Sequence, residues 1–324
     1  MLAFIFQRIA QSIFVVVSVS LLVFLALYAV GSPVDMLLPP DADEEDIMQY
    51  SKALGLDKPI WDQYFIFLKN IFKGDLGYSF FHEVPALGLV IERMPATLEL
   101  AGTAIFLAIV IGVPLGIYAG LYPGSKVSQS IMGISIFGVS IPNFWQGVML
   151  ILLFSVSLNW LPSTGRGEVG HFLGIESSIF TIDGIKHLLL PAFNLALFYA
   201  ALLLRLTRAN VMEVAQLDYI KTAYAKGLSG KRVVLVHILK NVSIPLVTVI
   251  GLEFGSLIAF SVITETIFSW PGMGKLIIDS IFLLDRPVIV SYLIVVAVLF
   301  SLLNLTVDLL YSLLDPRIRV GSAS

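Results

Sequence analysis

The sequence contains no cysteine, which excludes disulfide bonds, thiolate nucleophiles and cysteine-ligated metals together. Charged residues are also scarce. They make up 13% of the 324 residues, against about 25% in soluble domains, whereas hydrophobic residues make up 57%. A soluble core cannot bury so much apolar surface, so we predict an integral membrane protein. The few histidines show no metal-ligand spacing, and we expect no metal site: they are His82, His171, His187 and His237.

The sequence also lacks the loop with which ATPases hold phosphate. That loop requires a glycine, four residues and then Gly-Lys-Ser/Thr, so that backbone amides surround the phosphate. The two Gly-Lys pairs, at 230–231 and 274–275, fail at both the first glycine and the final hydroxyl. These positions are Ala225 and Arg232 for one pair, and Ser269 and Leu276 for the other. We therefore predict that this chain is not an enzyme and binds no cofactor directly.

Six apolar stretches are long enough to cross a bilayer, which takes about 20 residues in a helix. They are 9–30, 98–121, 131–157, 188–206, 246–268 and 288–310. The first has no Ala-x-Ala cleavage site and is interpreted as a retained helix. The predicted fold class is an all-α integral membrane protein with six transmembrane helices.

Basic residues in the loops predict the orientation of these helices, because Lys and Arg concentrate on the cytoplasmic side. From Arg205, at the end of the fourth span, to Lys240, before the fifth, the chain carries seven bases and two acids, a net charge of +5. Residues 31–96 carry five bases and eleven acids, a net charge of −6. We therefore predict cytoplasmic amino and carboxyl termini.

This topology divides the chain into three parts: the amino terminus with the first span (1–30), an extracytoplasmic segment (31–96) and a five-helix core (97–324). Two helices are expected in the extracytoplasmic segment. Acidic residues at 41–46 are placed to cap one helix that runs towards Leu54, and we interpret the cluster as a solvated face rather than a cation site. The aromatic run from Ile60 to Phe72 predicts an interfacial helix that ends at Gly74.

Small residues and prolines within the spans indicate how the helices pack and bend. Gly112, Gly116 and Gly120 recur at intervals of four, which places them on one face and permits close helix contact in lipid. Pro114 and Pro142 predict bends in the second and third spans.

The segment 207–240 is too polar for lipid and rich in helix-forming residues. Ala223 and Ala225, followed by Gly227, predict a short helix with a compact surface that fits a partner's cleft. The alternative is a basic loop that only fixes topology, which explains the Lys and Arg residues but not the small ones.

Within this segment, Asp218-Tyr-Ile-Lys-Thr-Ala-Tyr-Ala-Lys-Gly-Leu resembles the cytoplasmic coupling loop of binding-protein-dependent ABC importer permeases. More narrowly, the chain resembles the first permease subunit of the dipeptide/oligopeptide/nickel family. Other matching segments follow in family order along almost the whole chain. They include Gly74-Asp-Leu-Gly-Tyr-Ser, Pro95-Ala-Thr-Leu-Glu-Leu, Ser140-Ile-Pro-Asn-Phe-Trp and Thr264-Glu-Thr-Ile-Phe-Ser-Trp-Pro-Gly-Met-Gly.

The resemblance implies a type I ABC importer permease fold in the bacterial cytoplasmic (inner) membrane. It implies a homologous second permease subunit, two ATP-binding cassette subunits that use ATP and Mg²⁺, and an extracytoplasmic substrate-binding protein as partners, together with membrane lipid and no nucleic acid. Peptides are the cargo that it favours, and nickel chelates, glutathione or another small solute remain alternatives. It assigns the ATPase contact to Asp218, Tyr219, Thr222, Ala223, Ala225, Lys226, Gly227 and Leu228.

Acidic residues in the spans are the remaining candidates for function, since ionised groups are costly in lipid. Glu253 is the most interior, and it has two interpretations: a residue of the translocation path or a satisfied contact between helices. We expect Glu99 to stabilise a helix start, and Glu265 and Asp308 to lie near water at span ends. A secondary transporter is the rival from another class, but it predicts paired midplane acids or bases and an inverted repeat, neither of which is clear in the sequence.

Overall fold

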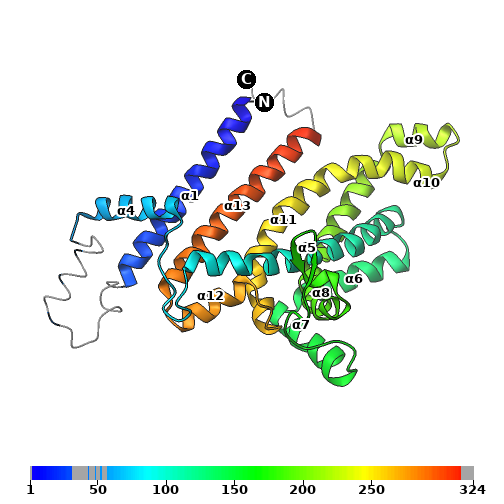
Figure 1. Cartoon of the computed structure of the whole chain (residues 1–324). Coiled ribbons are helices and arrows are strands. Elements are labelled where there is room, and N and C mark those ends of the chain that lie inside the picture. Colours follow the sequence, from blue (N-terminus) through cyan, green and yellow to red (C-terminus); the bar gives the residue numbers. More distant parts are fainter. Residues whose placement is uncertain (1, 31–42, 44–47, 49–51, 53–56, 315–324) are drawn as a thin grey trace. The chain divides into compact units, whose positions relative to one another are not determined.

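The computed structural model describes residues 2–30, 43, 48, 52 and 57–314. The proposed cap at 41–46 and its helix towards Leu54 lie outside the described residues, except for Asp43, Met48 and Lys52. The chain divides into two compact units, one formed by 93–278 with 303–324 and the other by 2–92 with 279–302. Helices dominate both units (Figure 1).

The helices and strands follow in this order: α1 (Leu2–Val30), α4 (Ile60–Lys73), α5 (Ala86–Leu121), α6 (Lys126–Ser140), α7 (Asn143–Leu150), the π-helix η1 (Ile151–Ser157), β1 (Gly170–Phe172), β2 (Ile175–Ser177), the 3₁₀-helix η2 (Ser178–Phe180), α8 (Ile182–Ala215), α9 (Asp218–Ala225), α10 (Gly230–Arg232), the π-helix η3 (Val233–Ile238), α11 (Leu239–Ile267), α12 (Met273–Phe282) and α13 (Arg286–Leu314). The strands β1 and β2 form one antiparallel hairpin, in which His171 pairs with Glu176.

Five of these helices are long and apolar enough to span a membrane, and a sixth span is obtained if α6 is joined to α7 and η1. That pair is bent by 103° at the break after Ser140. Five of the six predicted spans therefore coincide with candidate helices, and the third coincides with this bent pair. The third is broken rather than kinked, because Pro142 interrupts the helix and Ile141 adopts an extended conformation.

The predicted helix that ends at Gly74 is confirmed as α4. Gly74 has φ +74°, a left-handed conformation that favours glycine, and its N–H donates to the carbonyl of Ile71. The helix packs on α1, where the Tyr64 hydroxyl lies 2.9 Å from that of Ser20 and the Tyr64 ring lies 5.4 Å from that of Phe24.

The predicted glycine face of α5 is confirmed as a contact with α8. A Cβ atom added at Gly112 would lie 2.5 Å from the carbonyl oxygen of Ala200. At Gly116 and Gly120, the nearest atoms would lie 2.6 Å and 2.7 Å away, on Thr207 and Val211. Only glycine permits this approach. Among the candidate spans of the described chain, α8 is the most buried: 67% of the residues in its apolar stretch lie inside the protein.

Candidate functional site

The short helix α9 stands between the two long helices α8 and α11, and only Gln216 and Leu217 separate it from α8. Figure 1 shows α9 and α10 together at the end of this unit where α8 ends and α11 begins. Asp218 lies in the first turn, where a carboxylate complements the helix dipole, and accepts a 2.8 Å bond from Lys221. The hydrogen bond and the charge of Lys221 hold the pKa of Asp218 below its usual value.

As predicted, α9 is a short helix followed by Gly227; its last residue is Ala225. Gly227 has φ +77°, and its N–H donates to the carbonyl of Tyr224 at 2.9 Å. The N–H of Leu228 donates to the carbonyl of Ala223 at 3.3 Å. This pair of bonds satisfies carbonyls that the helix end leaves free, and it needs a left-handed residue at 227.

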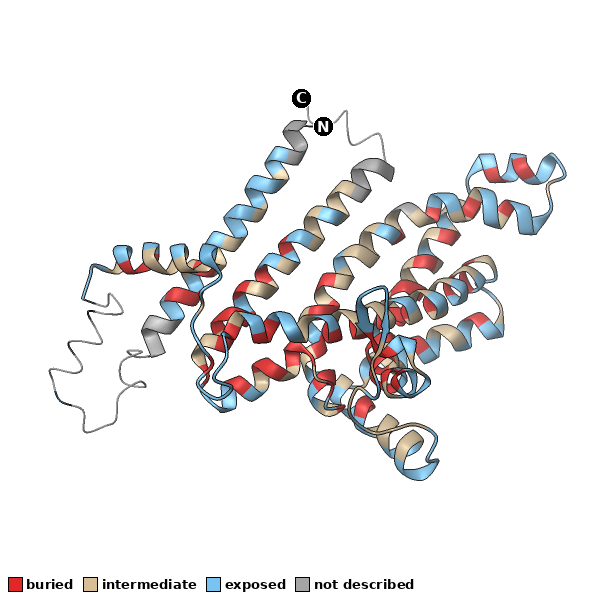
Figure 2. Ribbon diagram, viewed as in Figure 1, coloured by how far each residue is buried: buried red, intermediate tan, exposed pale blue. Residues whose placement is uncertain are grey.

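Only part of α9 is available to a partner. Ile220 and Ala223 are 1% and 6% exposed and face the chain's own interior, on the side where α9 contacts η3. Figure 2 shows α9 as a mostly exposed helix interrupted by buried positions. The exposed candidates are Asp218, Tyr219, Thr222, Ala225, Lys226 and Gly227, whereas Leu228 is half-buried.

Tyr219 is both exposed and anchored, because its hydroxyl accepts a 2.9 Å bond from the side-chain amide of Asn241 in α11. The two alanines expected to form one compact surface therefore lie on opposite sides of α9. Ala223 holds α9 against the chain, and Ala225 points outward.

Glu253 lies on a face of α11 that lines a cavity of about 600 Å³, together with Ser256, Phe260 and Ile263. The opposite walls come from α8, with Tyr199, and from the break between α6 and α7. The structure therefore brings Glu253 together with polar and aromatic side chains from three segments of the chain.

Side chains satisfy the backbone where α6 and α7 meet. The carbonyl of Gly138 has no helical donor, because the residue four positions later is Pro142 and has no N–H. The side-chain amide of Gln146 donates to that carbonyl at 2.6 Å. Next to the break, the Asn194 amide donates to Asn143 at 2.6 Å and to Thr264 at 3.2 Å, which ties α7, α8 and α11 together.

Glu265 is completely buried, so the expected place near water is wrong. Its carboxylate accepts bonds from the hydroxyls of Thr97 at 2.7 Å and Ser261 at 2.9 Å, and from the N–H of Lys275 at 3.0 Å. The hydroxyl of Thr97 also accepts from the N–H of Met273. These bonds fix the turn between α11 and α12 against α5.

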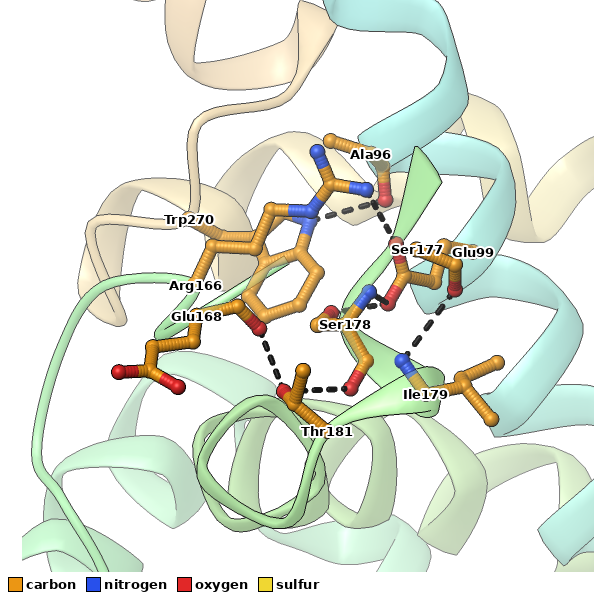
Figure 3. Close-up of polar contacts among 9 residues, drawn as sticks. All are labelled: Ala96, Glu99, Arg166, Glu168, Ser177, Ser178, Ile179, Thr181 and Trp270. Atoms are coloured by element: carbon orange, nitrogen blue, oxygen red, sulfur yellow. Dashed lines mark hydrogen bonds and ion pairs between the residues drawn. The ribbon is translucent and has the colours of Figure 1, made fainter. Parts of the chain in front are cut away.

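Glu99 forms a polar cluster with residues distant in sequence (Figure 3). Its carboxylate accepts from the guanidinium of Arg166 and from the N–H and hydroxyl of Ser178. Arg166 lies 5.9 Å from the centre of the Trp270 ring, and Trp270 donates to the carbonyl of Ala96 at 2.9 Å. The expected helix-start role of Glu99 is wrong, because α5 begins at Ala86.

Sequence reasoning missed this cluster and the partners of Glu265. Glu99 and Arg166 are 67 positions apart, and Thr97 and Glu265 are 168 apart, so no local spacing relates them. The available signal was an ionisable residue inside an apolar run, which identifies a residue that needs a partner but not the partner itself. Among the described residues, no group of three or more His, Asp or Glu is placed to hold a metal.

Comparison with known proteins identifies the family. Residues 112–320 match the model of the binding-protein-dependent transport system inner membrane component, and residues 1–101 match the model of its N-terminal region. The dipeptide transport system permease protein DppB of Escherichia coli strain K12 is 39% identical over 98% of this chain and 99% of its own length. The glutathione transport system permease protein GsiC of Escherichia coli O6:H1 is 36% identical over the same shares.

A solved structure agrees at the level of the fold. The inward-facing MetNI methionine ABC transporter aligns with a TM-score of 0.58 at 18% identity, over 71% of this chain and 98% of the matched chain. The all-α membrane architecture is thus that of an ABC importer permease. Together, the two family matches and the full-length relatives show that this chain belongs to the family of binding-protein-dependent transport system inner membrane components.

Proposed function

We propose that this chain is one permease subunit of an ATP-driven peptide importer in the bacterial cytoplasmic membrane. A homologous second permease subunit completes the translocation path, two ATP-binding cassette subunits hydrolyse ATP, and an extracytoplasmic binding protein delivers the cargo. Family membership supports this assembly, and the name of the relative DppB favours dipeptides. The relative GsiC, named for glutathione, keeps the same machinery open to another small peptide.

The observation that carries the proposal is the position of α9. This helix is short and polar, follows the candidate span of α8 after two residues, and is linked to the candidate span of α11 through α10 and η3. Its inner face is held by Ile220 and Ala223, and its outer face presents Thr222, Ala225 and Lys226. A partner that moves α9 therefore moves α8 and α11 with it.

The same two long helices carry the walls of the cavity, through Tyr199 on α8 and Glu253 on α11. Closure of the ATPases on ATP is transmitted through α9 to those walls, which gives alternating access to the path. The basic residues around α9 favour a cytoplasmic position for this helix, and the net negative charge of residues 31–96 favours the outer side for that segment.

The test is to add bulk to the outer face of α9 without disturbing its inner face. Ala225→Trp and Thr222→Trp are expected to weaken ATPase association by about tenfold to hundredfold, because overpacking typically costs about 1–3 kcal/mol. Uptake should fall while the abundance of the membrane protein stays normal. The measurements are ATPase co-purification and peptide uptake in cells that produce all subunits.

Two further variants control this test. Gln129→Trp alters another exposed residue, in the first turn of α6 and outside α9, and should leave association unchanged. Ala223→Trp should instead reduce abundance, because residue 223 packs within the chain. Normal uptake and normal co-purification in both outer-face variants would remove the assignment of α9 as the coupling helix.

A further inference from the structure

The cavity beside Glu253 joins two features that hydrocarbon does not tolerate. Glu253 lies eight residues into the candidate span Pro245–Ile267, about 12 Å along the helix axis from its start. The break at Ile141 and Pro142 is non-helical backbone within another candidate span. Both line the same cavity. Charged side chains and irregular backbone occur at membrane depth where they face protein or water, so this face of α11 is turned away from lipid.

Glu253 differs from Glu265, the other carboxylate of the same span. Glu265 is fully buried and accepts bonds from two hydroxyls and a backbone N–H, so its role is to hold the chain together. Within the described part of the chain, no hydrogen bond or salt bridge reaches the Glu253 carboxylate. Glu253 is half-buried on the cavity wall, where it is accessible to a ligand.

The rest of the cavity wall defines the ligand. None of the residues that line it, all of them described, is basic, so a cation is the expected counterpart of the carboxylate. The rings of Phe198, Tyr199 and Phe260 also line the cavity and add apolar surface that favours a nearby cation. A volume of about 600 Å³ is within the range of small-molecule sites, roughly 300–1,000 Å³.

We propose that Glu253 receives the protonated amino terminus of the peptide in transit, while the aromatic and aliphatic walls of the cavity accommodate its side chains. This inference rests on the proposed function, because it takes peptides as the cargo. It assigns specificity to the membrane path itself, in addition to whatever the binding protein selects.

The experiment uses the purified complex of both permease subunits with both ATPases, without the binding protein, so that only the membrane site is measured. The probes are alanyl-phenylalanine and its N-acetylated form, titrated to millimolar concentrations by calorimetry. The wild-type complex should bind the free-amino peptide about tenfold more tightly or better, because hydrogen bonds to charged groups are the stronger ones. Glu253→Gln should abolish that preference, and Glu253→Asp should retain part of it.

Ser256→Ala is the matched control, because it changes the same cavity wall without changing its charge and should keep the preference for the free amine. The inference is overturned if Glu253→Gln keeps the preference, if it weakens both peptides equally, as a bound sodium ion would predict, or if the wild-type complex binds neither peptide. Failure of the proposed function has a different signature: the ATPase subunits would not co-purify with the wild-type permease.

Discussion

Replacing Gly112 by alanine is expected to destabilise the contact between α5 and α8. The three atoms nearest to an added Cβ all belong to the backbone of Ala200, at 2.5, 3.2 and 3.2 Å. A side chain could rotate away, but the backbone of a packed helix cannot. The two helices would have to separate by about 0.5 Å to restore 3.0 Å, the shortest approach that Cβ atoms normally show.

The magnitude follows from two opposing effects. Overpacking of this kind typically costs about 1–3 kcal/mol. Alanine recovers about 0.5–1 kcal/mol, because glycine is the poorer helix former. A net loss of up to about 2.5 kcal/mol is therefore expected for Gly112→Ala. Gly102 lies in the same helix with no atom within 4 Å of an added Cβ, so Gly102→Ala should show only the gain, up to about 1 kcal/mol.

The assay is the apparent unfolding temperature of the purified, detergent-solubilised protein. Gly112→Ala should unfold at a lower temperature than the wild type, and Gly102→Ala at the same or a higher one. Shifts of the same sign and size in both variants, or a stabilised Gly112→Ala, would refute the assignment of close packing to this face of α5.

Two further predictions concern Glu265 and the topology. Glu265→Gln should lower stability by about 1–3 kcal/mol, because an amide keeps only one of the two accepting oxygens. Either the N–H of Lys275 or the hydroxyls of Thr97 and Ser261 would then face an NH₂ group. Glu253→Gln, which loses no such bond, should unfold like the wild type, and equal stability of the two variants would contradict the structural role of Glu265. Single cysteines are informative in a chain that has none: in intact cells an impermeant thiol reagent should label Ser51→Cys but not Ser229→Cys, and equal labelling would reject the proposed orientation.

Features that depend on neighbouring residues were readable from the sequence. The six apolar runs, the end of α4 at Gly74 and the glycine face of α5 are set by length, by local backbone conformation and by helical spacing. The C-terminal end of α9 was also readable from the sequence, because the left-handed conformation that closes this helix favours a glycine, here Gly227. Each of these signals lies within one continuous stretch of the chain, which is why one sequence suffices to find it.

The tertiary structure decided which side chains meet. It turned Ala223 inward and Ala225 outward on one short helix, buried Glu265 among donors from other segments and left Glu253 on a cavity wall. It also converted the bend at Pro142 into a 103° break whose free carbonyl is satisfied by Gln146. The sequence alone determined that the ionisable residues within the spans are costly in a membrane. Helix packing determines the partner of each one, because the groups that satisfy it come from segments up to 168 positions away.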